Sequence, residues 1–293
     1  VNFIKMPNFF YNEYKDQLNL FIKNALSEDI RDGDLTGNAC IPEGSIKSAK
    51  LYVKTPCIIA GIELVEKIFK FYDPSIKFNK LINDGTRVNQ SSTPFIVEGN
   101  ARSILATERL VLNTLQRMSG IASITNNLKE KIKSFNTVLL DTRKTTPNFR
   151  YPEKWAVKIG GGSNHRMGLF DAIMIKDNHI DYSNNLEDAL YKTQIYIEKL
   201  KPKKIFVVVE IRKVFEINKI LKFNWIDRIL LDNMNVNELK KAVRLIDGKF
   251  KTEASGGINE LNIIEVAKTG VDYISLGALT HSSPYIDLSL KAN

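Results

Sequence analysis

The sequence is poor in cysteine and histidine, with two of the former and three of the latter in 293 residues. Cys40 and Cys57 are far apart and lack metal-ligand spacing, which indicates reduced, structural thiols of a cytosolic protein and excludes a disulfide scaffold. The three histidines, His165, His179 and His281, are too few for a histidine-rich metal site. The segments HRMG and KDNH around two of them do not have zinc spacing.

Long hydrophobic runs are also missing. No stretch reaches the roughly 18 apolar residues of a membrane span, and the apolar segment within residues 1–10 is too short for a signal peptide. We therefore expect a cytoplasmic protein without membrane attachment. Glycine and proline are unremarkable, and the composition of 43% apolar and 26% charged residues excludes collagen-like and disordered chains.

Two further absences concern nucleotides and nucleic acids. The glycine-rich segment GGGSNHR (160–166) lacks the spacing of a P-loop and of a dinucleotide-binding turn. The net charge is +9, but the cations scatter along the chain and form no arm for nucleic acid. A net positive charge without such an arm still favours small polyanionic substrates as ligands.

What the second half of the chain does contain is a repeated pattern of apolar runs that end in a polar residue or glycine. The runs are 137–140, 171–175, 205–209, 228–231, 251–254 and 272–276, and they end at Asp141, Lys176, Glu210, Asp232, Ser255 and Gly277. Amphipathic helical segments such as 185–200 and 235–246 lie between them. Strands that alternate with helices predict parallel strands joined by right-handed crossovers.

These repeats predict an α/β protein with a closed C-terminal (β/α) barrel of about seven units, counting a short one near 160–166. In such barrels the chemistry lies at the C-terminal ends of the strands, so the polar residues should meet at one mouth. An open doubly wound sheet is the alternative, and it would spread them along a crevice.

The first hundred residues have a different pattern, in which hairpin-like strands mix with helices such as 14–29 and 61–72. We predict an N-terminal α+β domain at 1–115 and a barrel domain at 116–293, leaving open that the last residues return to the first domain. A long helix within 102–135 joins the two, and an interruption at Ser119-Gly120 is left open.

The expected mouth is rich in cations, which predicts a polyanionic ligand. Its cations are Arg143, Lys144, His165, Arg166 and Lys176. Glu210 and Asp232 are either salt-bridge partners of the lysines, or they face developing positive charge, sugar hydroxyls and a divalent metal. Asp141 is interpreted as a loop-capping acid. Glycines at adjacent strand ends, in the turns EASGGI and SLGALTHS, favour a phosphate site. Lys176 as a Schiff-base lysine is an alternative.

Several segments together resemble the quinolinate phosphoribosyltransferase family, also called carboxylating nicotinate-nucleotide pyrophosphorylases. They are EDIRDGDLT (28–36), TERLVLNTLQRMSGIA (107–122), DTRKTTPNFR (141–150), GGGSNHRMGLFDAIMIKDNHI (160–180), VVVE (207–210), LLDNM (230–234), EASGGI (253–258) and DYISLGALTHS (272–282). The resemblance implies that quinolinate and phosphoribosyl pyrophosphate give nicotinate mononucleotide, pyrophosphate and CO2, with Mg²⁺, in NAD biosynthesis. It also implies a homodimer in which Arg109 reaches the neighbouring subunit's site.

The resemblance further implies roles for single residues. The residues that would hold the carboxylates of quinolinate are Arg109, Arg143, His165 and Arg166, with Thr142 assisting. Lys144 and Lys176 would bridge substrate and pyrophosphate, while Glu210 and Asp232 would face the ribose and hold Mg²⁺, directly or through water. The residues that would line the 5′-phosphate pocket are Ser255, Gly256, Gly257, Gly277 and His281. From the sequence alone, Arg109 belongs instead to a solvated polar stripe with Asn113 and Arg117.

The chain departs from the family pattern at a few positions. Asn148 stands where glycine is frequent, Tyr151-Pro152 replaces a leucine-containing segment, and Arg212 replaces an acid of many members. Pro152 is expected at a helix N-terminus, where proline is tolerated, whereas Arg212 puts any list of metal ligands in doubt. The competing hypotheses are a molybdenum-associated paralogue of the same fold, a Schiff-base barrel lyase, and a basic module that binds nucleic acid.

Overall fold

The structure, a computed structural model, describes residues 9–202 and 204–292. The signal-peptide prediction falls mostly on residues outside these ranges. The chain forms two compact units. The first comprises the described residues up to Asn126, Thr145–Gly161 and the residues from Leu279 on; the second comprises Asn127–Lys144 and Gly162–Ala278. The predicted boundary between residues 115 and 116 stays a prediction.

The first unit is built on a four-stranded antiparallel sheet in the order β12-β1-β5-β3. Its strands are β1 (Ile46–Val53), β3 (Lys77–Lys80), β5 (Phe95–Asn100) and β12 (Leu288–Ala292), and β2 (Cys57–Ile58) pairs with β4 (Arg87–Val88) beside it. Alternate residues of β1, from Ala49 to Val53, are buried, as expected for a sheet covered on one face. The end of the chain thus returns to this unit, where Leu290 lies opposite Leu51.

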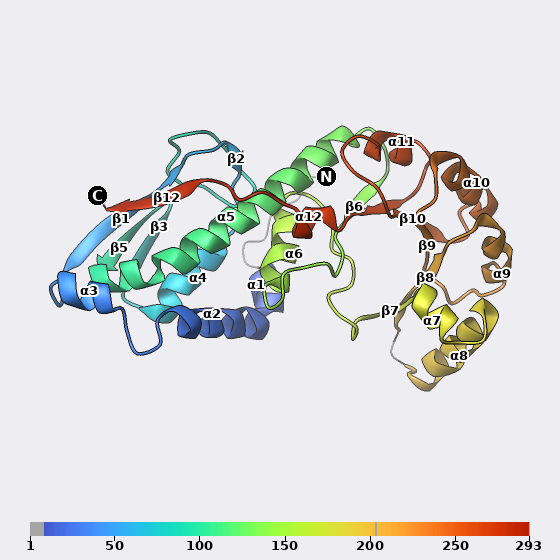
Figure 1. Ribbon diagram of the computed structural model, residues 1–293, viewed down its shortest axis with the longest axis horizontal. Coiled ribbons are helices and arrows are strands. Elements are labelled where there is room, and N and C mark those ends of the chain that lie inside the picture. Colours follow the sequence, from blue (N-terminus) through green and yellow to red (C-terminus); the bar gives the residue numbers. More distant parts are fainter. Residues whose placement is uncertain (1–8, 203, 293) are drawn as a thin grey trace. The chain divides into compact units, whose positions relative to one another are not determined.

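Seven helices among the described residues accompany this unit in whole or in part. They are α1 (Phe9–Glu13), α2 (Lys15–Asp29), α3 (Leu35–Cys40), α4 (Ile62–Tyr72), α5 (Ala101–Lys131), α6 (Arg150–Ile159) and α12 (Ala278–His281). Figure 1 shows α4 and α5 alongside the sheet. The Asp84 carboxylate accepts hydrogen bonds from the backbone N–H groups of Ile62 and Glu63, so the N-terminus of α4 is satisfied by a favourable negative charge.

Helix α5 continues through Ser119-Gly120 without a break, so the interruption left open from the sequence does not occur. A Cβ atom at Gly120 would overlap the backbone oxygen of Pro284. Glycine is therefore present because another segment approaches the helix closely, and this approach does not require the helix to end.

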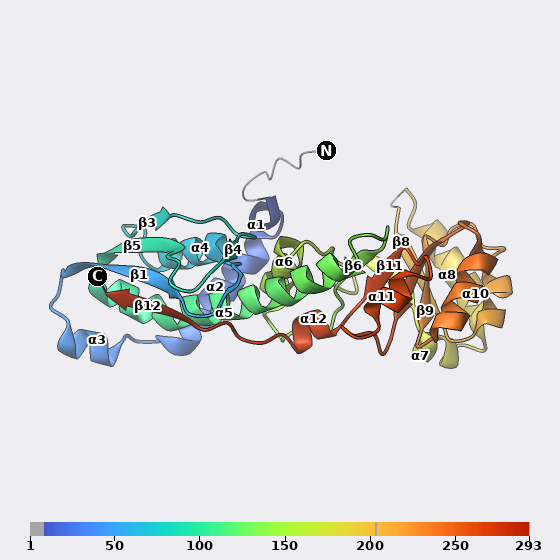
Figure 2. The same ribbon diagram turned by 90° about the horizontal axis from the view of Figure 1, so that it is seen from above.

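The second unit contains a six-stranded parallel sheet in the order β6-β11-β10-β9-β8-β7. Its strands are β6 (Val138–Leu140), β7 (Ala172–Ile175), β8 (Phe206–Ile211), β9 (Arg228–Asp232), β10 (Lys251–Ser255) and β11 (Tyr273–Ser275). The connecting helices are α7 (Asp177–Asp181), α8 (Leu186–Lys199), the 3-10 turn η1 (Val214–Glu216), α9 (Ile217–Ile220), α10 (Val236–Ile246) and α11 (Ile263–Ala267). Figure 1 shows α8 to α11 outside these strands, and Figure 2 shows α10 there from a second direction.

The last strand, β11, pairs with the first, β6, so the sheet curls round into barrel order. This pairing agrees with the predicted barrel and argues against an open doubly wound sheet. Between β6 and β7 the predicted short unit near 160–166 is reduced to one parallel bridge, from Leu140 to Ser163. Strands such as β8, with Val207 to Val209 fully buried, are covered on both faces, which explains their continuous apolar sequence.

No helix in the described ranges is long and apolar enough to cross a membrane.

The two cysteines are both free, as expected, but their surroundings differ. Cys40 is exposed, whereas Cys57 is buried in β2, and burial raises the pKa of its thiol to about 11.

At pH 8 only about one Cys57 side chain in a thousand would be the reactive thiolate. We expect a thiol reagent to modify one cysteine of the native protein rapidly and the second only after denaturation; rapid modification of two native thiols would contradict this expectation.

Candidate active site

The parallel sheet of the second unit brings the predicted polar residues to one edge. Lys176 follows β7, Asp232 ends β9 and Ser255 ends β10 directly opposite Asp232. Glu210 lies inside β8 and not after it, which corrects the expected end of that strand. Because neighbouring parallel strands end on the same side, these residues share the C-terminal face of the barrel.

Lys176 and Glu210 form an ion pair across adjacent strands, with Lys176 Nζ 3.7 Å from Glu210 Oε2. Burial raises the pKa of the Glu210 carboxyl, Lys176 opposes the rise, and the negative charge of Asp232 adds to it. The two acids are thus close enough to feel one another. The structure thus contains the Lys176–Glu210 ion pair, while the Asp232 carboxylate accepts a hydrogen bond from the side chain of Asn233.

Arg143 and Arg166 are close enough for their charges to interact. Burial lowers the pKa of the Arg166 guanidinium, and the positive charge of Arg143 lowers it further, against the opposing effect of Asp171. Arg166 Nη1 donates to the carbonyl oxygen of Ala172, at the start of β7. Two nearby guanidinium groups repel one another, so an anion between them would be stabilised. The Thr142 hydroxyl accepts from the Lys144 backbone N–H and shapes the turn after β6.

Asp141 is a fully buried cap, as the sequence predicted. Its carboxylate accepts from the backbone N–H of His165 at 2.8 Å and from the Asn164 side chain at 2.6 Å. The backbone N–H of Arg166 in turn donates to His165 Nδ1 at 2.7 Å. The chain from Asn164 to Arg166 is therefore held from the end of β6.

The glycine turn after β10 has a left-handed backbone. Gly256 and Gly257 have φ values of +89° and +62°, where side chains are strained. A Cβ atom at Gly256 would overlap the side chain of Asn233. Gly277 follows the neighbouring strand β11, so glycine-containing turns follow two adjacent strands.

Two predicted site residues belong to the first unit. Arg109 is exposed on α5 and makes no hydrogen bond or ion pair with any residue in the described ranges. His281 is exposed at the end of α12, with Nδ1 2.5 Å from Ser282 Oγ. Their predicted roles therefore stay predictions.

Arg117 corrects the idea of a solvated polar stripe on α5. Its guanidinium binds Glu153 Oε1 through Nε at 3.0 Å and Nη2 at 2.9 Å, and only 13% of its side chain is exposed. The Glu153 carboxylate also accepts from the backbone N–H and hydroxyl of Thr146, at 3.0 and 2.8 Å. The pair joins α5 and α6 to the segment that follows DTRK.

The departures from the family pattern also have local explanations. Asn148 has a φ of +61°, a left-handed conformation that glycine adopts freely and asparagine tolerates. Pro152 lies in the first turn of α6, as expected. Arg212 Nη2 lies 3.2 Å from the carboxylates of both Asp177 and Asp181, so it binds the acids of α7, beside Lys176.

Sequence reasoning missed a buried pair, Arg228 and Glu253, whose side chains lie 2.8 Å apart between β9 and β10. The available signal was an acid inside the strand KTEAS, of which Glu253 is fully buried. A buried acid requires a partner, but no local pattern identifies it.

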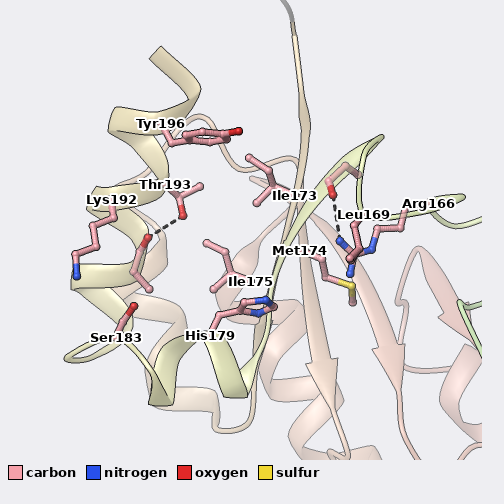
Figure 3. Close-up of a pocket in the computed structure, with 12 residues that line it drawn as sticks. Arg166, Leu169, Ile173, Met174, Ile175, His179, Ser183, Lys192, Thr193 and Tyr196 are labelled. Atoms are coloured by element: carbon pink, nitrogen blue, oxygen red, sulfur yellow. Dashed lines mark hydrogen bonds between the residues drawn. The ribbon is translucent and has the colours of Figure 1, made fainter. Parts of the chain in front are cut away.

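A pocket of about 400 Å³ lies between β7 and α8 (Figure 3). Ile173 and Ile175 point into it from the strand, and Thr193 and Tyr196 face them from the helix. Of the predicted site residues, Arg166 alone lines this pocket. Lys176, Glu210 and Asp232 are not among the residues that line the pocket.

The carboxylates at the strand ends are too few to hold Mg²⁺ without further ligands. No group of three or more His, Cys, Asp or Glu side chains in residues 9–202 and 204–292 could hold a metal ion by itself. Mg²⁺ is usually bound by one or two carboxylates together with substrate phosphates, and Glu210 with Asp232 supplies that number. The residues therefore fit a Mg²⁺ ion that arrives with a phosphorylated substrate.

Comparison with known proteins decides the family. The model of the family described as quinolinate phosphoribosyl transferase, C-terminal domain, matches residues 121–291, and that of the N-terminal domain matches residues 34–119. The chain belongs to the quinolinate phosphoribosyltransferase family. The family's function is the phosphoribosyl transfer to quinolinate in NAD biosynthesis, and this is the function of the chain.

The sequence similarity to relatives in this family extends over most of the chain and most of each relative. A mitochondrial quinolinate phosphoribosyltransferase (decarboxylating) of Nicotiana tabacum is 45% identical over 91% of this chain and 80% of its own. A chloroplastic nicotinate-nucleotide pyrophosphorylase (carboxylating) of Arabidopsis thaliana is 41% identical over 94% and 82%. The solved nicotinate-nucleotide pyrophosphorylase of Francisella tularensis has a TM-score of 0.86 at 37% identity, with 95% and 96% covered.

These matches exclude three hypotheses for the chain: the lyase, the nucleic-acid module and the molybdenum-associated paralogue. They do not assign roles to single side chains.

Proposed function

We propose that Arg143 and Arg166, with Thr142 and His165 beside them, bind the two carboxylates of quinolinate. The proximity of the two guanidinium groups supports this assignment, because a carboxylate bound between them relieves their mutual repulsion. Planar guanidinium groups also fix the orientation of a flat dicarboxylate. The pyridine nitrogen is then presented to the sugar at a constant angle.

The reaction then needs charge of both signs. The quinolinate nitrogen forms a bond to C1 of the ribose as the bond from C1 to pyrophosphate breaks, and pyrophosphate leaves with the electron pair. Positive charge develops on the sugar, and Glu210 and Asp232 stabilise it from beneath. Lys144 and Lys176 neutralise the departing pyrophosphate, and the Lys176–Glu210 pair at 3.7 Å supports placing both charges at the same strand ends.

Decarboxylation follows from the positive charge on the ring nitrogen. The bond from C2 to the carboxylate next to that nitrogen breaks and CO2 leaves. The bonding electrons stay on C2, where the adjacent pyridinium charge stabilises them, and a proton from water then adds to C2, giving nicotinate mononucleotide. Ser255, Gly256, Gly257 and Gly277 bind the 5′-phosphate through backbone N–H groups, a proposal that rests on the left-handed glycines. His281 is assigned to the same phosphate by the family resemblance alone.

Glu210 and Asp232 are the residues that would hold Mg²⁺, directly or through water. When bound, Mg²⁺ would supply positive charge to the pyrophosphate group.

The observation that carries these assignments is the meeting of Lys176, Glu210 and Asp232 on adjacent strands. The test is to incubate the protein with quinolinate, phosphoribosyl pyrophosphate and Mg²⁺ and to measure CO2 and nicotinate mononucleotide. Equal activity with nicotinate in place of quinolinate would refute the two-carboxylate site.

We also propose a homodimer in which Arg109 completes the neighbouring subunit's site. Its exposed side chain without a partner in the described residues supports this. Arg109→Ala and Lys144→Ala proteins should each be nearly inactive, because each damages every site of its own homodimer. Mixed dimers should regain up to about a quarter of the activity, since half of the protein forms heterodimers with one intact site in two. Assay of verified heterodimers is the measurement, and no recovery in them would exclude sharing.

A cytoplasmic location is the final part of the proposal. The two free thiols support a reducing compartment, whereas the Nicotiana and Arabidopsis relatives are named mitochondrial and chloroplastic. Cell fractionation with organelle markers decides between these locations.

A further inference from the structure

A chain of charged side chains crosses the second unit next to the proposed quinolinate site. Glu253, in β10, is fully buried, and its Oε2 lies 2.8 Å from Arg228 Nη1 and 3.3 Å from His165 Nε2. The side chains of Arg228 and His165 are themselves about nine-tenths buried, at 10% and 8% exposure. Arg228 and His165 therefore share one carboxylate oxygen of Glu253 away from solvent.

Arg228 is fixed independently of Glu253. Its guanidinium lies over the ring of Tyr273, 3.9 Å from the centroid, and 5.1 Å from the centroid of Phe206. Burial alone would raise the pKa of the Glu253 carboxyl, but the His165 ring, whose Nε2 lies 3.3 Å away, and the charge of Arg228 bring that pKa below its ordinary value. Glu253 is thus a permanent anion at neutral pH, held in place by an aromatic-stacked arginine.

His165 is constrained at both ring nitrogens. Nε2 faces the ionised Glu253, which accepts only, so the proton of the neutral ring belongs on Nε2. Nδ1 accepts from the backbone N–H of Arg166 at 2.7 Å. The backbone of His165 is held in turn by Asp141.

We propose that Glu253 is a positioning residue for substrate binding: it fixes the tautomer and ring orientation of His165, which in turn holds Arg166 where a quinolinate carboxylate binds. Glu253 touches no substrate and acts through His165. The part concerning quinolinate rests on the proposed function, whereas the tautomer of His165 does not. The role explains why a carboxylate is kept inside a strand whose other buried neighbours could be apolar.

The test compares two double variants, Glu253→Gln with Arg228→Met and Glu253→Met with Arg228→Met. Both remove the buried ion pair and replace it with side chains of similar length, so neither leaves a stranded charge. They differ in one property, because glutamine can still accept from His165 Nε2 and methionine cannot. We expect KM for quinolinate to be about 10- to 100-fold higher in the methionine variant than in the glutamine variant. KM for phosphoribosyl pyrophosphate should differ by less than about threefold, because the defect lies at the dicarboxylate.

A second measurement needs no enzyme activity and compares the parent protein with the methionine variant. Because the chain has three histidines, His179→Gln and His281→Gln assign the His165 ring signals in a long-range proton–nitrogen NMR spectrum at pH 8. The parent protein should show a protonated Nε2 and an unprotonated Nδ1, and the methionine variant should show a mixture. A protonated Nδ1 in the parent, or equal KM values for quinolinate in two folded variants, would overturn the proposal. Absence of quinolinate turnover with the expected tautomer would refute the proposed function and leave the positioning of His165 intact.

Discussion

Replacement of Glu210 by glutamine is expected to lower kcat by about 10²- to 10³-fold, the usual cost of removing one group that stabilises developing charge. The amide has the same shape, so binding of both substrates should change much less than kcat. What is lost is the negative charge under the sugar when pyrophosphate departs. The loss should appear in kcat and in kcat/KM alike, as for an interaction made mainly in the transition state.

A matched control is Glu265→Gln, which removes a carboxylate from an exposed ion pair with Lys268. Steady-state kinetics of the two variants separate the local role of Glu210 from a general effect of one lost charge. If Glu210→Gln keeps kcat within about threefold of the parent, Glu210 does not face the reacting sugar.

The largest expected effect on stability is that of Glu153→Gln. The Glu153 carboxylate is fully buried and accepts from Arg117 Nε and Nη2, from the Thr146 backbone and from the Thr146 hydroxyl. An amide has one acceptor oxygen, so its NH2 group must face one of these donors. Breaking a buried pair from one side costs about 3–5 kcal/mol because the remaining charge is stranded. We expect the free energy of unfolding to fall by that amount.

Glu98→Gln is the comparison for this variant, because Glu98 forms an exposed pair with Lys77 at 2.9 Å. Surface pairs contribute about 0–1 kcal/mol, so its effect on denaturant unfolding should be far smaller. Adding Arg117→Met to a Glu153→Leu variant should restore part of the lost stability, since no charge is then left buried. Equal losses for Glu98→Gln and Glu153→Gln would show that the Arg117 pair contributes no more than a surface contact.

The strand ends illustrate how far a sequence can be interpreted without coordinates. The runs before Asp141, Lys176 and Asp232 are strands β6, β7 and β9, because an apolar run followed by polar residues is a local signal. Parallel order then places their ends together by topology. The capping role of Asp141 was predictable for the same reason. Strand β8 extends through Glu210, beyond its predicted end, because a strand can continue through a polar residue that has a partner.

The partners of buried charges could not be predicted in this way. Arg117 was expected at the surface because its helix neighbours are polar at i−4 and i−8, yet Glu153, 36 residues away, binds it. Glu253 was not singled out at all, and its partner Arg228 lies 25 residues before it. The sequence also left open whether α5 breaks at Gly120, which is explained only by the approach of Pro284.

The sequence by itself determined the alternation of strands and helices and the family, and it supplied the predicted site residues, since these depend on local periodicity and on motifs of contiguous residues. Only the tertiary structure decided which charges are buried, which carboxylate serves which cation, and how the last strand meets the first. The physical reason is that the stability of a buried charge, or of an unpaired sheet edge, depends on partner groups that lie far away in the sequence. Only folding brings those partners close.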